Sequence, residues 1–159
     1  MFHHYTTGRN LRDILAAKTI YPCAIYEDDD DTVPKWVWFS CRRTWEPVEN
    51  GAHDEISDWV DQTKEGMRLN GNGLFRISVV PDVAPQDYKA HLHQRLRGIA
   101  VYYVDDLIDI ATDQKLRFLD YRFSTEPVPS TQWSSIETEV DGVWIPFNPA
   151  DSDYFKDVA

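Results

Sequence analysis

The sequence contains few cysteines and shows no arrangement typical of a metal site. Only two of its 159 residues are cysteine, Cys23 and Cys41, so no disulfide framework is defined. Neither cysteine has a second cysteine or a histidine at the spacing of a zinc site. His91 and His93 fall on different faces of a predicted helix. We therefore expect no metal, and a reducing cytoplasm as the compartment.

Basic residues are also scarce. Lysine and arginine total 16 residues against 27 aspartates and glutamates, which gives a net charge of −11. Proteins that bind nucleic acid need a basic surface, so we do not expect nucleic acid as a partner. Solubility is the simplest explanation of the acidic surface, and docking onto a basic partner or imitation of nucleic acid is the alternative.

No apolar run approaches the roughly 20 residues that span a bilayer, and no basic segment followed by an apolar one opens the chain. We therefore expect no membrane partner. Apolar residues make up 42% of the chain, enough for one hydrophobic core. Because no repeat or linker is visible, we predict a single domain over residues 1–150 and an acidic tail over residues 151–159.

The first forty residues predict a strand, a helix and a second strand. The strand covers Phe2–Thr6, and the helix covers Asn10–Ala17 with Asn10 as its N-cap. An acidic loop over residues 23–34 leads to a strand at Lys35–Ser40. Alternation along that strand places Trp36, Trp38 and Ser40 on one face.

The rest of the chain shows both helical and strand patterns, which favours an α+β fold. A weak helix is predicted over residues 56–67 and a turn over residues 70–73, and the clearest strand covers residues 74–80. Two helical patterns fall within residues 88–111, and residues 116–131 look irregular. The chain ends in a hairpin over residues 136–140 and 143–147, around the type I′ turn pair Asp141-Gly142.

No phosphate loop, dinucleotide fingerprint or nucleophile elbow is present. A weaker set of features is coherent: His4-Tyr5-Thr6, the capped helix, Ile20-Tyr21-Pro22 and Val37-Trp38-Phe39-Ser40. This set resembles the opening of the ADP-ribosyltransferase fold, in the branch of diphtheria toxin and the poly-ADP-ribose polymerases. That branch opens with a histidine strand, a helix and an aromatic strand, and closes with a glutamate at the start of a late strand, here Glu137.

The resemblance implies a single-domain split β-sheet sandwich with flanking helices. It implies NAD as substrate and transfer of ADP-ribose to an unknown acceptor, which could be a protein, as in bacterial or phage effectors and toxins. NAD hydrolysis alone is a variant of the same activity. The alternative from another class is a non-catalytic acidic binding or inhibitor protein on the same fold.

Ligand-binding roles also follow from the resemblance. His4 matches the histidine that hydrogen-bonds the ribose on the nicotinamide side, and Thr6 lies near the backbone that holds the carboxamide. Tyr5, which stands where the family has a glycine, is also assigned a ligand contact, and Lys35-Trp36 replaces a second glycine. Trp38 would stack on the nicotinamide ring and Ser40 would orient the ligand. Two further ligand contacts are assigned to Arg42, which could instead pair with acids, and Trp45.

The implied catalytic residues are His4 and a glutamate of the terminal hairpin. Glu137 matches the catalytic glutamate, which stabilises the positive charge that develops on the ribose. Glu139 is its rival because Glu137-Thr138-Glu139 resembles the Glu-x-Glu pair of the arginine-modifying branch. Both glutamates would point to the same side of a strand, so the sequence leaves this choice open.

Overall fold

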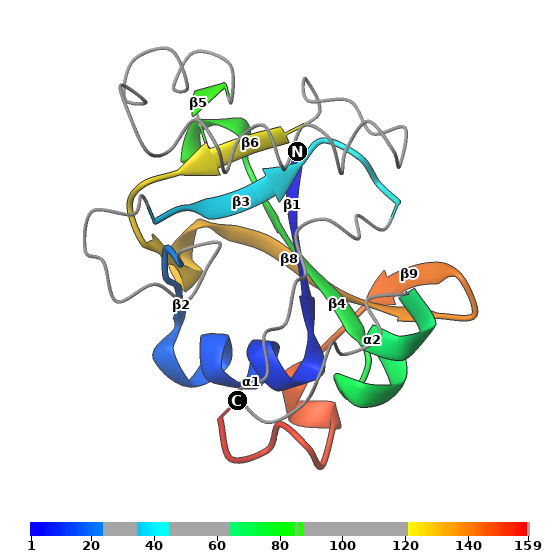
Figure 1. Cartoon of the computed structure of the whole chain (residues 1–159). Coiled ribbons are helices and arrows are strands. Elements are labelled where there is room, and N and C mark those ends of the chain that lie inside the picture. Colours follow the sequence, from blue (N-terminus) through cyan, green and yellow to red (C-terminus); the bar gives the residue numbers. More distant parts are fainter. Residues whose placement is uncertain (24–34, 45–63, 85, 88–120, 159) are drawn as a thin grey trace.

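A computed structural model describes residues 1–23, 35–44, 64–84, 86–87 and 121–158 of the chain (Figure 1). These residues form a mixed α+β structure, which confirms the α+β part of the predicted fold class. The main sheet contains β1 (Phe2–Thr7), β3 (Val37–Ser40), β4 (Leu74–Val79), β5 (Gln86–Asp87), β6 (Tyr121–Ser124), β8 (Trp133–Val140) and β9 (Val143–Pro146). A small sheet pairs β2 (Thr19–Ile20) with β7 (Val128–Pro129). The helices are α1 (Gly8–Ala17) and α2 (Lys64–Asn70), with 3-10 turns η2 (Pro81–Val83), η4 (Ser130–Gln132) and η5 (Pro149–Asp151).

The order of strands in the main sheet places the first strand in the middle. The order is β5–β6–β3–β1–β4–β8–β9, and every neighbouring pair is antiparallel. β1 pairs with β4 along its whole length, but with β3 at one registered pair only, His3 opposite Ser40. The sheet therefore consists of two blocks that diverge between β1 and β3. Figure 1 shows β3 and β6 running across the direction of β1 and β4.

Helix α1 begins earlier than the sequence pattern predicts. Thr7, the last residue of β1, has an extended backbone and its hydroxyl accepts a hydrogen bond from the Asn10 N–H at 3.5 Å. Thr7 is therefore the N-cap, and the prediction of Asn10 in that role is wrong. The helix ends at Lys18, whose φ of 53° is the left-handed conformation common at helix C-termini.

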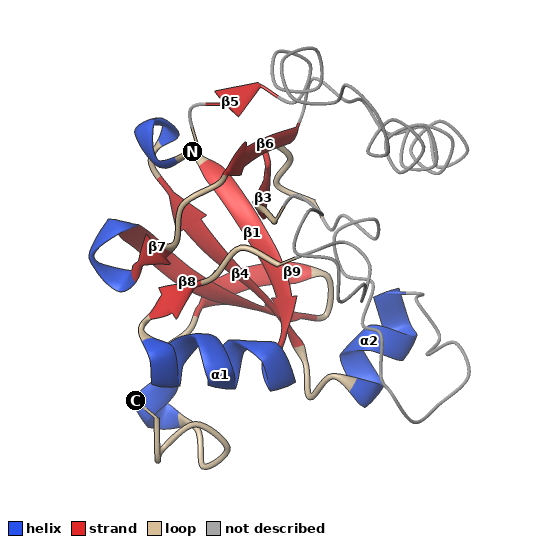
Figure 2. Cartoon of the chain, turned by 60° about the vertical axis from the view of Figure 1, so that its left-hand side comes forward, coloured by secondary structure: helices blue, strands red, loops and turns tan. Residues whose placement is uncertain are grey.

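The hydrophobic core lies between α1, the C-terminal segment and one face of the sheet (Figure 2). The helix contributes Leu11 and Leu15 at helical spacing, as the apolar stripe predicts. The main sheet contributes buried side chains from β3 and β4, among them Phe39, Ile77 and Val79. Packing of this apolar face fixes which way each strand points its alternate residues.

The segment that follows Pro149 packs on the core and differs from the predicted acidic tail. Phe155 is only 2% exposed, and its ring centroid lies 5.5 Å from that of Phe75 and 5.2 Å from that of Phe147. Phe155, with Tyr154 and Val158 packed against the core beside it, holds this acidic segment against the protein. The C-terminus accordingly lies beside α1 in both views (Figures 1 and 2).

The β8–β9 hairpin confirms the predicted turn. Val140 pairs with Val143, and the two residues between them, Asp141 and Gly142, have φ values of 51° and 83°. Positive φ at both central residues is the requirement of a type I′ turn. By contrast, β6 and β7 occupy part of residues 116–131, which the sequence pattern left irregular. The helices predicted within residues 88–111, and most of the one at 56–67, lie outside the described residues.

Replacing Leu11 with alanine tests the packing of α1 on the sheet. Leu11 is 0% exposed, so Leu11→Ala should lower the free energy of unfolding by about 2–5 kcal/mol through lost burial and the cavity left behind. Leu69→Ala is the matched control because Leu69 is 64% exposed, and its loss should be below ~1 kcal/mol. Urea unfolding followed by circular dichroism measures both. Equal losses would show that α1 does not pack as described.

Candidate functional site

The register of the sheet sorts the predicted site residues between its two faces. Side chains of residues that stand opposite each other in an antiparallel sheet point to the same face. Tyr5 stands opposite Arg76, and Arg76 stands opposite Glu137, so these three form one row. His4 stands opposite the core residue Ile77 in the alternate row, on the face that packs against α1. His4 and Glu137 therefore lie on opposite faces of the sheet.

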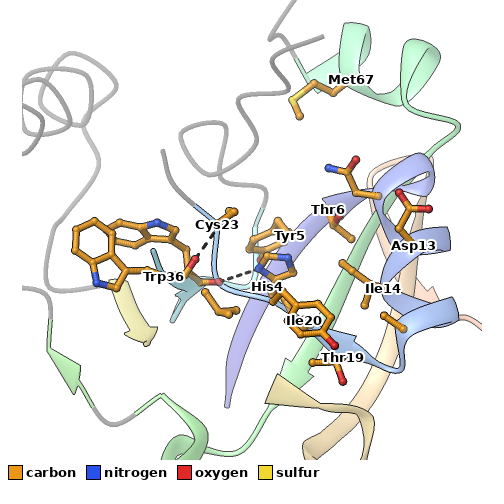
Figure 3. Close-up of a pocket in the computed structure, with 15 residues that line it drawn as sticks. His4, Tyr5, Thr6, Asp13, Ile14, Thr19, Ile20, Cys23, Trp36 and Met67 are labelled. Atoms are coloured by element: carbon orange, nitrogen blue, oxygen red, sulfur yellow. Dashed lines mark hydrogen bonds between the residues drawn. The ribbon is translucent and has the colours of Figure 1, made fainter. Parts of the chain in front are cut away.

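A cleft of about 440 Å³ lies where β1 separates from β3 (Figure 3). Its walls come from β1, α1, β3 and the chain between β2 and Cys23, with Met67 of α2 at one side. Because the strands diverge, residues of both faces of β1 reach the cleft. Four residues with predicted ligand contacts line it: His4, Tyr5, Thr6 and Trp38.

His4 is held in one tautomer inside this cleft. Its Nδ1 lies 2.9 Å from the backbone carbonyl oxygen of Trp38, which can only accept, so Nδ1 carries the proton. Burial lowers the pKa of His4, and the hydrogen bond to Trp38 opposes that shift in part. The ring is therefore neutral, and Nε2 has no hydrogen-bond partner among the described residues. Nε2 is thus an acceptor for a ligand hydroxyl or N–H group.

Aromatic rings form one side of the cleft. The indoles of Trp36 and Trp38 meet edge to face with centroids 5.5 Å apart, and the ring of Phe123 lies 5.9 Å from each. Tyr21 also lines the cleft and is largely exposed. Rings of this kind offer flat faces to a planar ligand.

Among the described residues of the cleft, one residue of α1 carries a charge. Asp13 is the only carboxylate among the described lining residues, and no lysine or arginine is among them. Asp13 lies on the helix that faces the strand of His4 (Figure 3). The resemblance gives no role to Asp13, and its position on the surface of a short helix carries no functional signal in the sequence.

Glu137 belongs to a separate polar network on the other face of the sheet. Arg76 donates to both of its carboxylate oxygens, from Nε at 2.8 Å and from Nη2 at 2.9 Å. The Arg76 guanidinium also donates to the carbonyl of Arg43 at 2.7 Å and lies 4.7 Å from the ring centroid of Trp144. The hydrogen bonds from Arg76 lower the pKa of Glu137 below its usual value. The predicted catalytic carboxylate is therefore ionised and already paired.

The histidine on the Glu137 face is His3, which the sequence analysis did not single out. Its Nδ1 lies 2.9 Å from the Ser78 hydroxyl oxygen, and both side chains are buried. Burial, with a smaller contribution from the positive charge of Arg76, lowers the pKa of His3 to about 4. His3 and His4 are adjacent in a strand, so their side chains point to opposite faces. Nothing in the sequence shows which of the two shares a face with Glu137.

Ser40 and Arg42 shape the turn after β3 and are not among the residues that line the cleft. The Ser40 hydroxyl accepts a hydrogen bond from the Arg42 N–H at 3.1 Å. The Tyr5 hydroxyl donates to the Arg42 carbonyl at 2.7 Å. Tyr5 thus ties β1 to this turn, in a position where the resemblance expects a glycine.

The last two predicted site residues are Glu139 and Trp45. Glu139 accepts from Lys64 Nζ at 3.1 Å and from the Gly142 N–H at 2.6 Å, so it links α2 to the β8–β9 turn. Its side chain is 6% exposed and is not among the residues of the cleft. Trp45 lies outside the described residues.

Comparison of the chain with protein-family models, curated protein sequences and solved structures gave no match. Within the described part of the chain, no helix is long and apolar enough to cross a membrane. The same residues contain no group of three His, Cys, Asp or Glu side chains placed to hold a metal ion. A proposal about function therefore rests on the geometry of the cleft and of the network around Glu137.

Removing Arg76 tests whether the network is structural. Arg76→Ala should cost about 3–5 kcal/mol of stability, because it leaves a mostly buried Glu137 carboxylate without its partner. Arg68→Ala is the matched control, since the Arg68–Glu65 pair is exposed and should contribute less than ~1 kcal/mol. Chemical denaturation measures both. A loss at Arg76 no larger than that at Arg68 would refute the structural role.

The pKa of His3 predicts a pH dependence of stability. His3 ordinarily titrates at 6.5 and in the folded protein at about 4. Between these two values the unfolded state binds more protons, so the free energy of unfolding should fall as the pH is lowered from 6.5 to about 4. In His3→Gln this fall should be smaller, and the lowered pKa of His4 should account for part of the remainder. Urea unfolding across this range measures the slope, and identical slopes in both proteins would contradict the prediction.

Proposed function

We propose that the chain binds NAD by its nicotinamide half in the cleft between β1, α1 and β3, and transfers ADP-ribose to an acceptor or to water. One observation carries the proposal: His4 is fixed as a neutral acceptor, by its hydrogen bond to the Trp38 carbonyl, in a cleft that both residues line. These are the two residues to which the resemblance assigns the ribose and the nicotinamide ring.

The binding mode follows from the groups of the cleft. A ribose hydroxyl donates to His4 Nε2, and the nicotinamide ring stacks on Trp38. The carboxamide lies against the backbone of Tyr5 and Thr6, where β1 leaves β3. Such positioning aligns the ring as a leaving group and lowers the entropic part of the barrier.

The chemistry requires a carboxylate near the ribose. The bond between ribose C1 and the nicotinamide nitrogen breaks, and its electron pair leaves with neutral nicotinamide. The ribose becomes positively charged until an acceptor oxygen or water attacks C1 and releases a proton. Glu137 has this role by resemblance, but it lies on the other face and is paired with Arg76. Asp13 is the one carboxylate among the described residues that line the cleft, so we assign to it the stabilisation of that charge.

A second candidate function is binding without chemistry. The observation that favours it is the double hydrogen bond from Arg76, which occupies both oxygens of Glu137. A chain of this kind would keep the cleft for a ligand and use its acidic surface toward a basic partner.

Labelled NAD separates the two functions. Nicotinamide release and label transfer measure the reaction, and quenching of tryptophan fluorescence measures binding. His4→Ala should weaken NAD binding roughly tenfold, the effect of losing one hydrogen bond. Asp13→Asn should lower the rate with a smaller effect on binding. His3→Gln is the matched control, because His3 neighbours His4 but is not among the residues that line the cleft.

The outcomes are distinct. Nicotinamide release that is lost in Asp13→Asn and retained in folded Glu137→Gln supports the assignment of the carboxylate. Release that is retained in Asp13→Asn and lost in folded Glu137→Gln would assign the catalytic role to Glu137 and overturn our assignment. Binding that depends on His4, without any release, supports the non-catalytic function. If the wild-type chain neither binds nor cleaves NAD, the proposed function is wrong.

A further inference from the structure

We propose that the cleft selects an organic cation and that Asp13 is the residue that determines this specificity. The identity of the cation as a pyridinium ring rests on the proposed function, whereas the preference for positive charge rests on the cleft alone. For NAD the preferred group would be the oxidised nicotinamide ring, which carries a full positive charge that the reduced ring lacks.

The first argument is the charge of the lining residues. Asp13 provides the only carboxylate among the described residues of the cleft, and neither lysine nor arginine is present there. His4 does not compensate, because its Nδ1 donates to the Trp38 carbonyl and the ring is neutral. Among the described lining residues, a phosphate would meet a carboxylate and no lysine or arginine, whereas a cation would meet a charge of opposite sign.

The second argument is the aromatic side of the cleft. Trp36, Trp38 and Tyr21 all line it. The face of an aromatic ring is negative, and indole attracts cations more strongly than the other rings do. Trp36 is only 6% exposed, so a ligand against it is partly removed from water, and this strengthens the ring contact, whereas Asp13 is exposed and its attraction acts through solvent.

The geometry supports simultaneous contact with both groups. The cleft of about 440 Å³ is within the range of small-molecule sites. Asp13 lies on α1, whereas Trp38 belongs to β3 and Trp36 directly precedes that strand, so the acid and the tryptophans line the cleft from different elements (Figure 3). A flat cation between them can stack on a ring and keep its charge toward the carboxylate. A neutral ring of the same shape gains the stacking contact only.

The experiment is a comparison of matched cationic and neutral probes by isothermal titration calorimetry. The small pair is 1-methylnicotinamide, a cation, and nicotinamide, which is neutral. The large pair is NAD and NADH. We expect the wild-type chain to prefer the cationic member of each pair by about tenfold, and Asp13→Asn to reduce this preference to about twofold.

Asp141→Asn is the matched control. Asp141 is an exposed acid in the β8–β9 turn, away from the residues of the cleft, and asparagine suits its positive φ equally well. This variant removes the same charge from the protein and should keep the tenfold preference. If both variants lose the preference equally, overall charge causes it and the role of Asp13 is refuted.

The results separate this inference from the proposed function. If NAD and NADH bind with equal affinity and Asp13→Asn changes nothing, charge selection is overturned while NAD binding stands. If 1-methylnicotinamide binds in an Asp13-dependent way but NAD does not bind, charge selection stands and the proposed function fails. If none of the probes binds, both are overturned.

Discussion

The divergence of β3 from β1 is the constraint on which the rest of the structure depends. One registered pair, His3 with Ser40, joins the two blocks of the sheet, and beyond it the strands separate. The His4 side chain bridges the separation through its hydrogen bond to the Trp38 carbonyl. Where the two strands separate, their backbone N–H and C=O groups can no longer pair with each other. The His4 side chain bonds to one of these groups, and the cleft lies between the strands. The cleft is therefore a consequence of the strand geometry.

The two polar systems on either side of the sheet differ in what they leave available. In the network, Arg76 saturates Glu137, and His3 bonds to Ser78. Such a satisfied buried network specifies a unique structure and offers little to a ligand. In the cleft, by contrast, His4 keeps one nitrogen without a partner among the described residues. This difference is the physical reason why we place ligand binding in the cleft and a structural role on the opposite face.

The resemblance to the ADP-ribosyltransferase fold assigns roles to residues of both the cleft and the network around Glu137. The resemblance assigns ligand contacts to His4 and Trp38, and both residues line the cleft because β1 and β3 are neighbours in the sheet. It does not anticipate that Glu137 stands in the row of Tyr5 and Arg76. A shift of one residue in strand register moves every side chain to the other face, and motif spacing does not encode that register. The resemblance therefore remains the source of a proposal about NAD.

The sequence by itself determined the mixed α+β class, the apolar stripe of α1, the strand at residues 74–79 and the type I′ hairpin. These features depend on local periodicity and on turn residues such as Asp141-Gly142, which act within a few positions. Tertiary structure alone decided the N-cap at Thr7, the burial of Phe155 and the presence of Asp13 at the cleft. It also decided the pairing of Glu137 with Arg76. Each of these depends on contacts between segments far apart in the chain, and their energies arise only when the sheet brings those segments together.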